Sequence, residues 1–192
     1  KHPFLRKSTF PRKYHNGNYL FDWEDDLIPK VGSELKPVVN VSWFAARNYC
    51  NYLGKRLVSE AEWEMAARAG NEGEYSIDGG VEFLSDYAWF HENSGGEIHN
   101  TAQKLSNPNG IYDVHGNVWE WVYDWFGIFK NSKSINPQGP EFGKYRVIRG
   151  GSWKEPAKNL RSSMRRDAYP TSTFNDVGFR CAANKDVFSL QN

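Results

Sequence analysis

The sequence predicts an α+β domain with long ordered loops and little regular structure. Two segments with helical spacing and clear caps lie in the first half, short β-like segments recur after residue 122, and aromatic residues make up 16% of the chain, with eight tryptophans. Helices that are followed by scattered strands are typical of α+β domains. A chain of 192 residues can bury one sizeable core.

The first expected elements are a short strand over 37–41 and a helix over 43–53. Ser42 is a good N-cap and Gly54 a good residue to end the helix. Helical spacing places four residues of this segment on one face, which we expect to be buried: Trp43, Ala46, Cys50 and Leu53.

A second helix begins at a capping box formed by Ser59 and Glu62 and ends near Gly70. Its apolar side is formed by Trp63, Ala66 and Ala67. Residues 71–112 are rich in Gly, Asn and Ser, which predicts long loops ordered by a few anchors.

Two later segments, 145–149 and 177–181, have β-like composition. Gly150 and Gly151 lie between them and predict a bulge or a sharp turn.

Charge and hydropathy exclude several function classes. The formal net charge is +1, with acids and bases interspersed, so there is no electrostatic footprint for nucleic acid or an anionic membrane. No apolar run approaches the roughly 20 residues that span a bilayer, so no membrane span is expected. No signal peptide is visible, but the chain begins at Lys1 without Met, so this carries no weight.

The most improbable motif is the run 116–121, in which Trp119 and Trp121 flank Glu120. Two tryptophans at this spacing indicate a packed wall. A carboxylate between them must be paired, hydrogen-bonded or bound to a metal, because an unpaired buried charge costs several kcal/mol.

The only two cysteines, Cys50 and Cys181, are too few for a structural zinc site. From the residues alone they are either a disulfide or two buried thiols.

Several motifs together resemble the formylglycine-generating enzyme family, also called the sulfatase-modifying-factor domain. Their order and spacing match the family over 37–183, which leaves 1–36 as an irregular N-terminal segment of the same domain and 184–192 as a C-terminal tail. The matching stretches are 41–43, 54–64, 66–68, 109–113, 116–121, 149–153 and 178–180. The resemblance implies a variant of the C-type-lectin-like fold, with bound calcium.

The resemblance also implies a calcium site around the 116–121 motif. The ligands would be the side chains of Asp113 and Glu120 and the backbone carbonyls of Gly116 and Val118. These are hard oxygen donors of the kind that Ca²⁺ takes. The alternative from the residues alone is an acid pair that is hydrogen-bonded to loop amides.

The family's cysteine chemistry maps only in part. Cys50 and Cys181 fall where relatives carry a structural disulfide. The two thiolates that bind Cu(I) and convert a substrate cysteine to formylglycine fall at Glu155 and Leu160. A carboxylate and an alkyl group cannot form a Cu(I) dithiolate, so no copper is expected and the chain resembles a divergent member without the catalytic cysteine pair.

The corresponding groove offers polar and aromatic side chains for a peptide, protein or small-molecule ligand. Its expected residues are Ser152, Trp153, Glu155, Arg161, Arg165 and Arg166. The alternative is that the arginines pair with loop acids and hold the fold.

Two functions therefore follow. The first is a calcium-stabilised accessory or binding protein located outside the cytoplasm: periplasmic, secreted or membrane-anchored. The second is an oxidoreductase or maturation factor that uses another metal, such as non-haem iron, or a site completed by an upstream segment or a partner subunit. For the second, His91 and His99 with Glu92 or Glu97 are the candidate metal ligands, although loop histidines are more often solvated.

Overall fold

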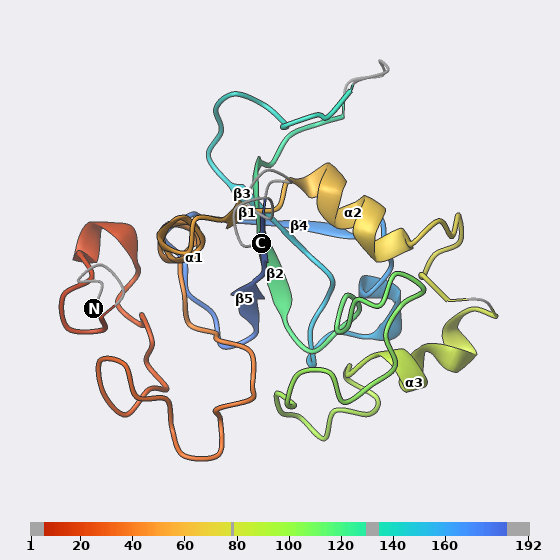
Figure 1. Cartoon of the computed structure of the whole chain (residues 1–192), viewed down its shortest axis with the longest axis horizontal. Coiled ribbons are helices and arrows are strands. Elements are labelled where there is room, and N and C mark those ends of the chain that lie inside the picture. The colour runs from red at the N-terminus through yellow and green to blue at the C-terminus, as the bar shows by residue number, and fades with distance from the viewer. Residues whose placement is uncertain (1–5, 78, 130–134, 184–192) are drawn as a thin grey trace, which may run out of the picture.

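The computed structural model describes residues 6–77, 79–129 and 135–183. Its elements in chain order are η2 Arg12–Tyr14, α1 Trp43–Tyr52, β1 Arg56–Leu57, α2 Glu60–Arg68, η3 Val81–Phe83, α3 Leu84–Tyr87, β2 Trp119–Trp125, β3 Arg146–Arg149, η4 Ala157–Asn159, β4 Arg165–Ala168, β5 Val177–Phe179 and β6 Cys181–Ala182. These short elements, joined by long loops, confirm the predicted α+β class (Figure 1).

The strands form two small sheets. One has the order β4-β3-β2-β5, in which β2 pairs antiparallel with β3 and parallel with β5. The other pairs β1 with β6 in antiparallel register. The strand β2 begins with the Trp-Glu-Trp motif, which therefore lies between β3 and β5.

The two main helices form as their caps predict. The Ser42 side chain accepts a hydrogen bond from the Ala45 N–H at the start of α1. At the start of α2, Ser59 and Glu62 form the full capping box. The predictions for 145–149 and 177–181 are also confirmed, by β3, β5 and the start of β6.

Three local predictions are wrong. Residues 37–41 form no strand: Asn40 adopts a φ of 56°, and its N–H and C=O bond to the loop residues Phe174 and Leu20. Leu53 is 45% exposed, because α1 ends at Tyr52 and Leu53 is its C-cap. The expected loop 71–112 contains the short helical segments η3 and α3.

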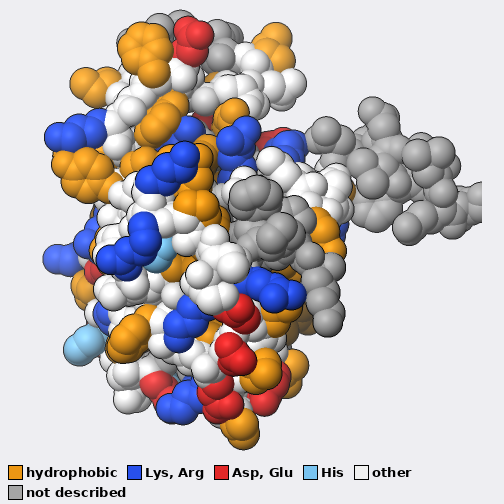
Figure 2. Space-filling view, turned by 90° about the vertical axis from the view of Figure 1, so that its left-hand side faces the viewer, with side chains coloured by type: hydrophobic (Ala, Val, Ile, Leu, Met, Phe, Trp, Pro, Cys, Tyr) orange, Lys and Arg blue, Asp and Glu red, His pale blue; other side chains and the backbone are white. Residues whose placement is uncertain are grey.

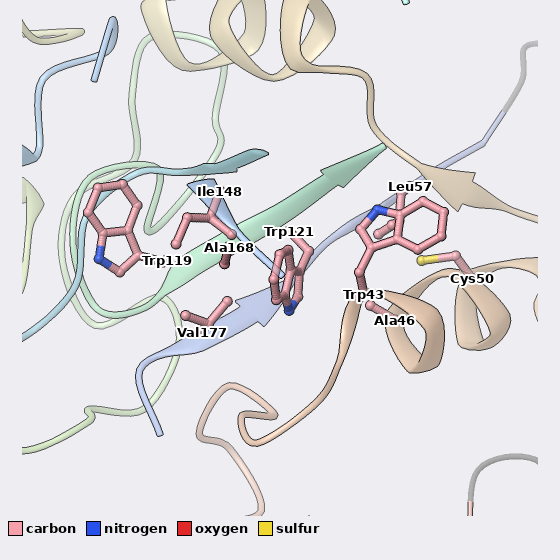
Figure 3. Packing of buried hydrophobic residues seen from close by; sticks show 9 residues of the cluster. All are labelled: Trp43, Ala46, Cys50, Leu57, Trp119, Trp121, Ile148, Ala168 and Val177. Carbon is pink, nitrogen blue, oxygen red and sulfur yellow. The ribbon is translucent and has the colours of Figure 1, made fainter. Parts of the chain in front are cut away.

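The main core lies where α1 packs against the larger sheet (Figure 3). It contains Trp43 from α1 and both tryptophans of β2, each at most 2% exposed. The indole N–H of Trp43 donates to the Val122 carbonyl at 2.8 Å, and that of Trp121 donates to the Val41 carbonyl at 3.0 Å. These rings therefore bury their apolar area without leaving a donor unpaired.

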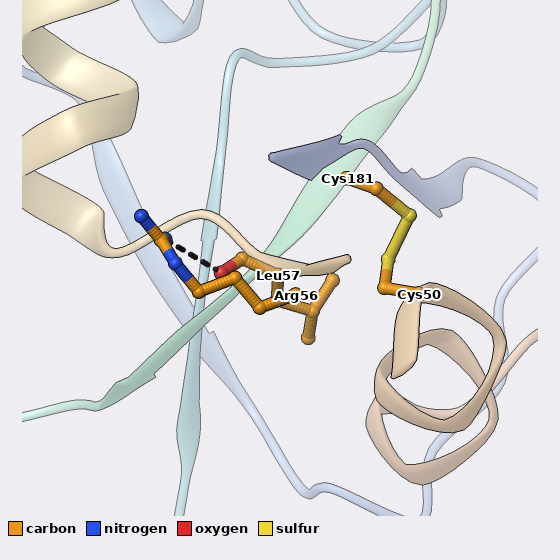
Figure 4. The surroundings of a disulfide bond; sticks show 4 residues. All are labelled: Cys50, Arg56, Leu57 and Cys181. Atoms are coloured by element: carbon orange, nitrogen blue, oxygen red, sulfur yellow. Dashed lines mark hydrogen bonds between the residues drawn. A yellow bond between two sulfur atoms is a disulfide. The ribbon is translucent and has the colours of Figure 1, made fainter. Parts of the chain in front are cut away.

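The two cysteines join this core to the end of the chain. Cys50 on α1 and Cys181 on β6 form a disulfide across 131 residues of sequence, beside Leu57 of β1 (Figure 4). In the chain-entropy model a disulfide that closes a loop of this length stabilises the fold by roughly 4–5 kcal/mol, because it restricts the unfolded chain.

The N-terminal segment packs on the outer side of α1. Phe10, Tyr19 and Leu20 are buried against Val41 and Ala45. The face that carries this segment shows basic, acidic and hydrophobic side chains together (Figure 2). No helix among the described residues is long and apolar enough to cross a membrane.

We expect Gly116→Ala to lower the free energy of unfolding by about 3 kcal/mol or more. Gly116 has a φ of 77°, and an added Cβ would lie 2.2 Å from the Trp89 carbonyl oxygen, so backbone strain and a steric clash combine. Gly110→Ala is the matched control, because Gly110 has a φ of 76° with nothing within 4 Å of an added Cβ. It should cost only about 1 kcal/mol. Equal losses in urea unfolding would contradict the steric argument.

Candidate functional site

The alternation of β2 separates the two tryptophans from the carboxylate between them. Successive side chains on a strand point to opposite faces, so Trp119 and Trp121 enter the main core while Glu120 faces α2. There the Trp63 indole donates to Glu120 Oε2 at 2.7 Å. Arg180, which follows β5, donates to the same oxygen at 2.6 Å and to Oε1 at 2.5 Å.

The carboxylate between the two tryptophans, Glu120, is therefore both ion-paired and hydrogen-bonded. Glu120 is 5% exposed and is compensated by a cation and an indole N–H. Burial would lower the pKa of the Arg180 guanidinium, but the charges of Glu120 and Asp113 and the hydrogen bond to Glu120 outweigh it and raise that pKa. The sequence indicates that Glu120 needs a partner but does not indicate that Trp63 and Arg180 are its partners, although these two residues lie in the matching stretches 54–64 and 178–180.

Three of the four expected calcium ligands border one cavity, whereas Gly116 is not among the described residues that line it. Asp113, Val118 and Glu120 line a volume of about 440 Å³, together with Arg180. Burial raises the pKa of the Asp113 carboxyl, and the nearby Glu120 charge adds a smaller rise. The 2.8 Å hydrogen bond from the Ala102 N–H and the charge of Arg180 act in the opposite direction. Two carboxylates thus face one cavity with one guanidinium between them. The carboxylates are hard oxygen donors, but both oxygens of Glu120 already accept hydrogen bonds from Arg180, so a hard cation here would have to share Glu120 with that guanidinium.

Two of the expected groove residues, Glu155 and Arg166, contact the Trp119 side chain, and Ser152 and Trp153 precede Glu155 in the chain. Glu155 accepts hydrogen bonds from Asn159 at 2.6 Å, Arg166 at 3.2 Å and the Trp119 indole at 3.4 Å. Ser152 is fully buried and donates to Asp176 at 3.2 Å. Between these two positions, the backbone carbonyl of Trp153 accepts from the Ser94 hydroxyl.

The other two arginines do not join this group. Arg165 is next to Arg166 on β4, so it points to the opposite face, where it forms a two-bond ion pair with Glu60 at 2.8 and 2.6 Å. Arg161 donates to Glu74 at 3.5 Å. The alternative expectation, that the arginines pair with acids, describes all three, and Arg165 has the most buried of these ion pairs.

Leu160 occupies the second position where the family carries a copper-binding thiolate. It is fully buried in a cluster with Tyr75, Leu84 and Phe90. A Cβ on Gly151 would lie 2.7 Å from its side chain. This position is therefore packed with hydrocarbon as well as lacking sulfur.

The loop histidines do not assemble a metal centre in the described part of the chain. His99 stacks on Trp89 with ring centroids 3.7 Å apart, and its Nε2 lies 2.7 Å from the Ser94 carbonyl oxygen. Among the described residues no three His, Cys, Asp or Glu side chains form a group that could hold a metal ion.

His115 directly precedes the 116–121 motif, and its ring connects this loop to the loops that carry Ser76 and Leu160. Its Nδ1 is 2.7 Å from the Leu160 carbonyl oxygen, and its Nε2 accepts from the Ser76 N–H at 3.1 Å. The ring is 1% exposed, and burial lowers its pKa to about 4. The geometry fits a neutral imidazole with its proton on Nδ1.

Comparisons with known proteins agree on the family. The model for the sulfatase-modifying factor enzyme 1-like domain matches residues 17–185. The formylglycine-generating enzyme of Streptomyces coelicolor is 37% identical over 177 residues, covering 83% of this chain and 56% of the relative. The serine/threonine-protein kinase Pkn1 of Chlamydia trachomatis serovar L2 is 40% identical over 168 residues, covering 84% and 26%. The inactive C-alpha-formylglycine-generating enzyme 2 of Mus musculus is 33% identical over 180 residues, covering 84% and 54%.

Solved structures give the same result for the fold. Treponema denticola variable protein 1 superimposes with a TM-score of 0.76 at 29% identity, over 84% of this chain and 77% of that one. PvdO from Pseudomonas aeruginosa has a TM-score of 0.70 at 32% identity, over 77% and 61%. The chain spans about a quarter of the chlamydial kinase and about half of the two other relatives.

We expect acid to destabilise the fold partly through His115. Its pKa of about 4 in the folded protein lies below the ordinary histidine value of 6.5, so its contribution to stability is present above pH 6.5 and is lost as the pH falls toward 4. The full loss is about 3 kcal/mol. Asp124 acts in the opposite sense, because burial raises its pKa to about 6, so the test compares two proteins rather than two pH values.

The comparison is between the wild type and His115→Asn, whose amide can replace the Nδ1 hydrogen bond. Urea unfolding from pH 7 to pH 4 should give a shallower loss for the variant. Parallel pH profiles would rule out His115 as an acid-sensitive group.

Proposed function

The chain belongs to the sulfatase-modifying factor enzyme 1-like domain family, and on this premise we propose that it is a ligand- or partner-binding member without copper-dependent formylglycine activity. One observation carries the proposal: Glu155 and Leu160 stand where the resemblance implies a pair of copper-binding thiolates. The only cysteines of the sequence, Cys50 and Cys181, are joined to each other. The chain therefore has no thiol to offer at the position of the family's chemistry.

The packing around these positions supports the same proposal. Leu160 is 0% exposed, and Glu155 is held by Arg166 and Asn159. Both residues are thus committed to contacts within the domain. A relative of similar identity whose name calls it inactive supports the view that this scaffold persists without the activity.

The surface at Glu155 is suited to recognition rather than to redox chemistry. Arg166 is half-exposed above the Trp119 ring, at 6.0 Å from its centroid. Lys154 lies beside Asn175 and 3.7 Å from Asp176. Adjacent charges of both signs over an aromatic ring can bind a polar ligand or a peptide. The disulfide supports a location outside the reducing cytoplasm.

We propose that calcium stabilises the domain at the cavity formed by Asp113 and Glu120. When bound, Ca²⁺ would supply charge neutralisation and link the 110–120 loop to β2. Asp113 and Glu120 would provide the carboxylates, and Gly116 and Val118 the backbone carbonyls. Asp113 supports this role because its half-buried carboxyl accepts a hydrogen bond from the Ala102 N–H and forms no ion pair among the described residues.

Chelation should lower the unfolding temperature of the purified chain, because removing a ligand that binds only the native state destabilises it. At a calcium concentration a hundredfold above Kd the difference is about 2.7 kcal/mol. Asp113→Asn should abolish the calcium response, whereas Asp86→Asn, at an exposed position on α3, should retain it. Identical melting curves with and without chelator would contradict the calcium proposal.

The copper argument is tested by Cu(I) competition with a chromogenic chelator and by oxygen consumption with a cysteine-containing peptide. We expect neither tight copper binding nor peptide oxidation. The double variant Glu155→Cys/Leu160→Cys should gain at least a hundredfold in Cu(I) affinity, since soft thiolates select Cu(I). Stoichiometric copper or iron in the wild type, with oxygen uptake, would instead establish the oxidoreductase alternative.

A further inference from the structure

A cavity beside α2 lies away from the groove at Glu155 and belongs to no site described above. It measures about 920 Å³ and lies between α2 and the connection from β2 to β3. Ala61 and Met65 of α2 form one wall, and Ile128, Phe129 and Phe142 of the connection form the other. In Figure 1 the described parts of this connection, 126–129 and 135–145, project from the sheet next to α2.

The rim of this cavity is unusually apolar for an exposed surface. Ile128 is 97% exposed, Phe142 81%, Met65 71% and Phe129 67%. Single exposed apolar residues are common, but four around one cavity form a contiguous patch of the kind that marks a binding surface. Phe and Met are also enriched in protein interfaces.

The charge inside the cavity has a definite sign. Four carboxylates line it, Glu60, Glu64, Asp124 and Glu141, against the single guanidinium of Arg165. Glu60 already takes Arg165 in a two-bond pair, and Glu64 is paired with Arg149 and Arg68. Asp124 and Glu141 form no ion pair among the described residues.

Arg165 itself cannot turn toward a ligand without disrupting the wall. Its guanidinium lies 4.6 Å from the ring centroid of Phe126 and 4.1 Å from that of Phe129, and it donates to the Gly127 carbonyl at 2.7 Å. The Arg165 side chain therefore holds residues 126–129 of the connection against the domain. The charge left for a ligand is negative.

Asp124 is the carboxylate with most to gain from a cation. It is 3% exposed, and its Oδ2 accepts from the Glu60 N–H at 2.7 Å. Burial, with a smaller contribution from the Glu60 charge, raises its pKa to about 6, although backbone hydrogen bonds and the Arg146 charge act in the opposite direction. A basic group placed in the cavity would offset that desolvation.

We propose that this cavity binds a basic, apolar peptide segment of a partner protein, with a Lys or Arg side chain directed at Asp124 and Glu141. The apolar neighbours of that side chain pack against Met65, Ile128 and Phe142. A second copy of this chain is disfavoured, because it would bring the same carboxylates to the contact. The proposal concerns a different face from the Glu155 groove and holds whether or not that groove binds a ligand.

The test uses the full chain against an immobilised positional-scanning library of acetylated hexapeptides. We expect selection of Lys or Arg flanked by Leu, Ile or Phe, and binding that weakens as salt is raised. For the best peptide, Glu141→Gln and Phe142→Ser should each reduce the affinity at least tenfold. Both positions are exposed, so their thermal unfolding should match the wild type.

Glu155→Gln is the matched control on the other face and should leave the affinity unchanged. Selection without a basic residue, or loss of binding in Glu155→Gln but not in Glu141→Gln and Phe142→Ser, would overturn the proposal. So would a concentration-dependent dimer, seen by light scattering, that Phe142→Ser dissociates, because the occupant would then be a second copy.

Discussion

The fold depends on the ion pair between Glu120 and Arg180, which lies on the face of β2 opposite its two tryptophans. Three parts of the chain meet there: α2 through Trp63, the central strand through Glu120, and the last strands through Arg180. A buried carboxylate is costly unless a cation and further hydrogen bonds compensate it. The pair therefore specifies how α2 and the C-terminal strands dock on the sheet, while the tryptophans supply the apolar burial.

The Glu155 groove and the α2 cavity are arranged by the same strand geometry. Arg165 and Arg166 are neighbours on β4, yet one holds Glu60 beside α2 and the other holds Glu155 beside Trp119. A single register of β4 on β3 thus divides the basic segment between two faces. Glu155 is held by Arg166 and Asn159 on one face, and a cavity of about 920 Å³ lies beside α2 on the other.

The local signals of the sequence predicted much of this architecture. Caps and periodicity located α1 and α2, because Ser42, Ser59 and Glu62 act on backbone groups within three residues. The strand expected at 37–41 does not form, because the Asn40 N–H donates a hydrogen bond to the carbonyl of Phe174 in a loop distant in sequence. Leu53 is exposed because α1 ends at Tyr52, and helical periodicity alone does not predict where a helix ends.

The candidate sites were less accessible from sequence because they depend on long-range contacts. The motif identified Glu120 as an acid that needs a partner, but its partners lie 57 and 60 residues away. The family resemblance grouped the six groove residues, whereas the alternation of β4 places Arg165 and Arg166 on opposite faces. The cavity beside α2 had no sequence signal, since its walls come from a helix and from the long connection after β2.

The most direct test of this account is a double-mutant cycle of Glu120→Gln and Arg180→Met, measured by urea unfolding in the presence of chelator. Arg180→Met leaves a buried carboxylate without its cation and should cost about 3 kcal/mol, more than Glu120→Gln. The double variant should recover part of that loss, with a coupling free energy of about 2 kcal/mol. Additive losses in the double variant would contradict the central place given to this ion pair.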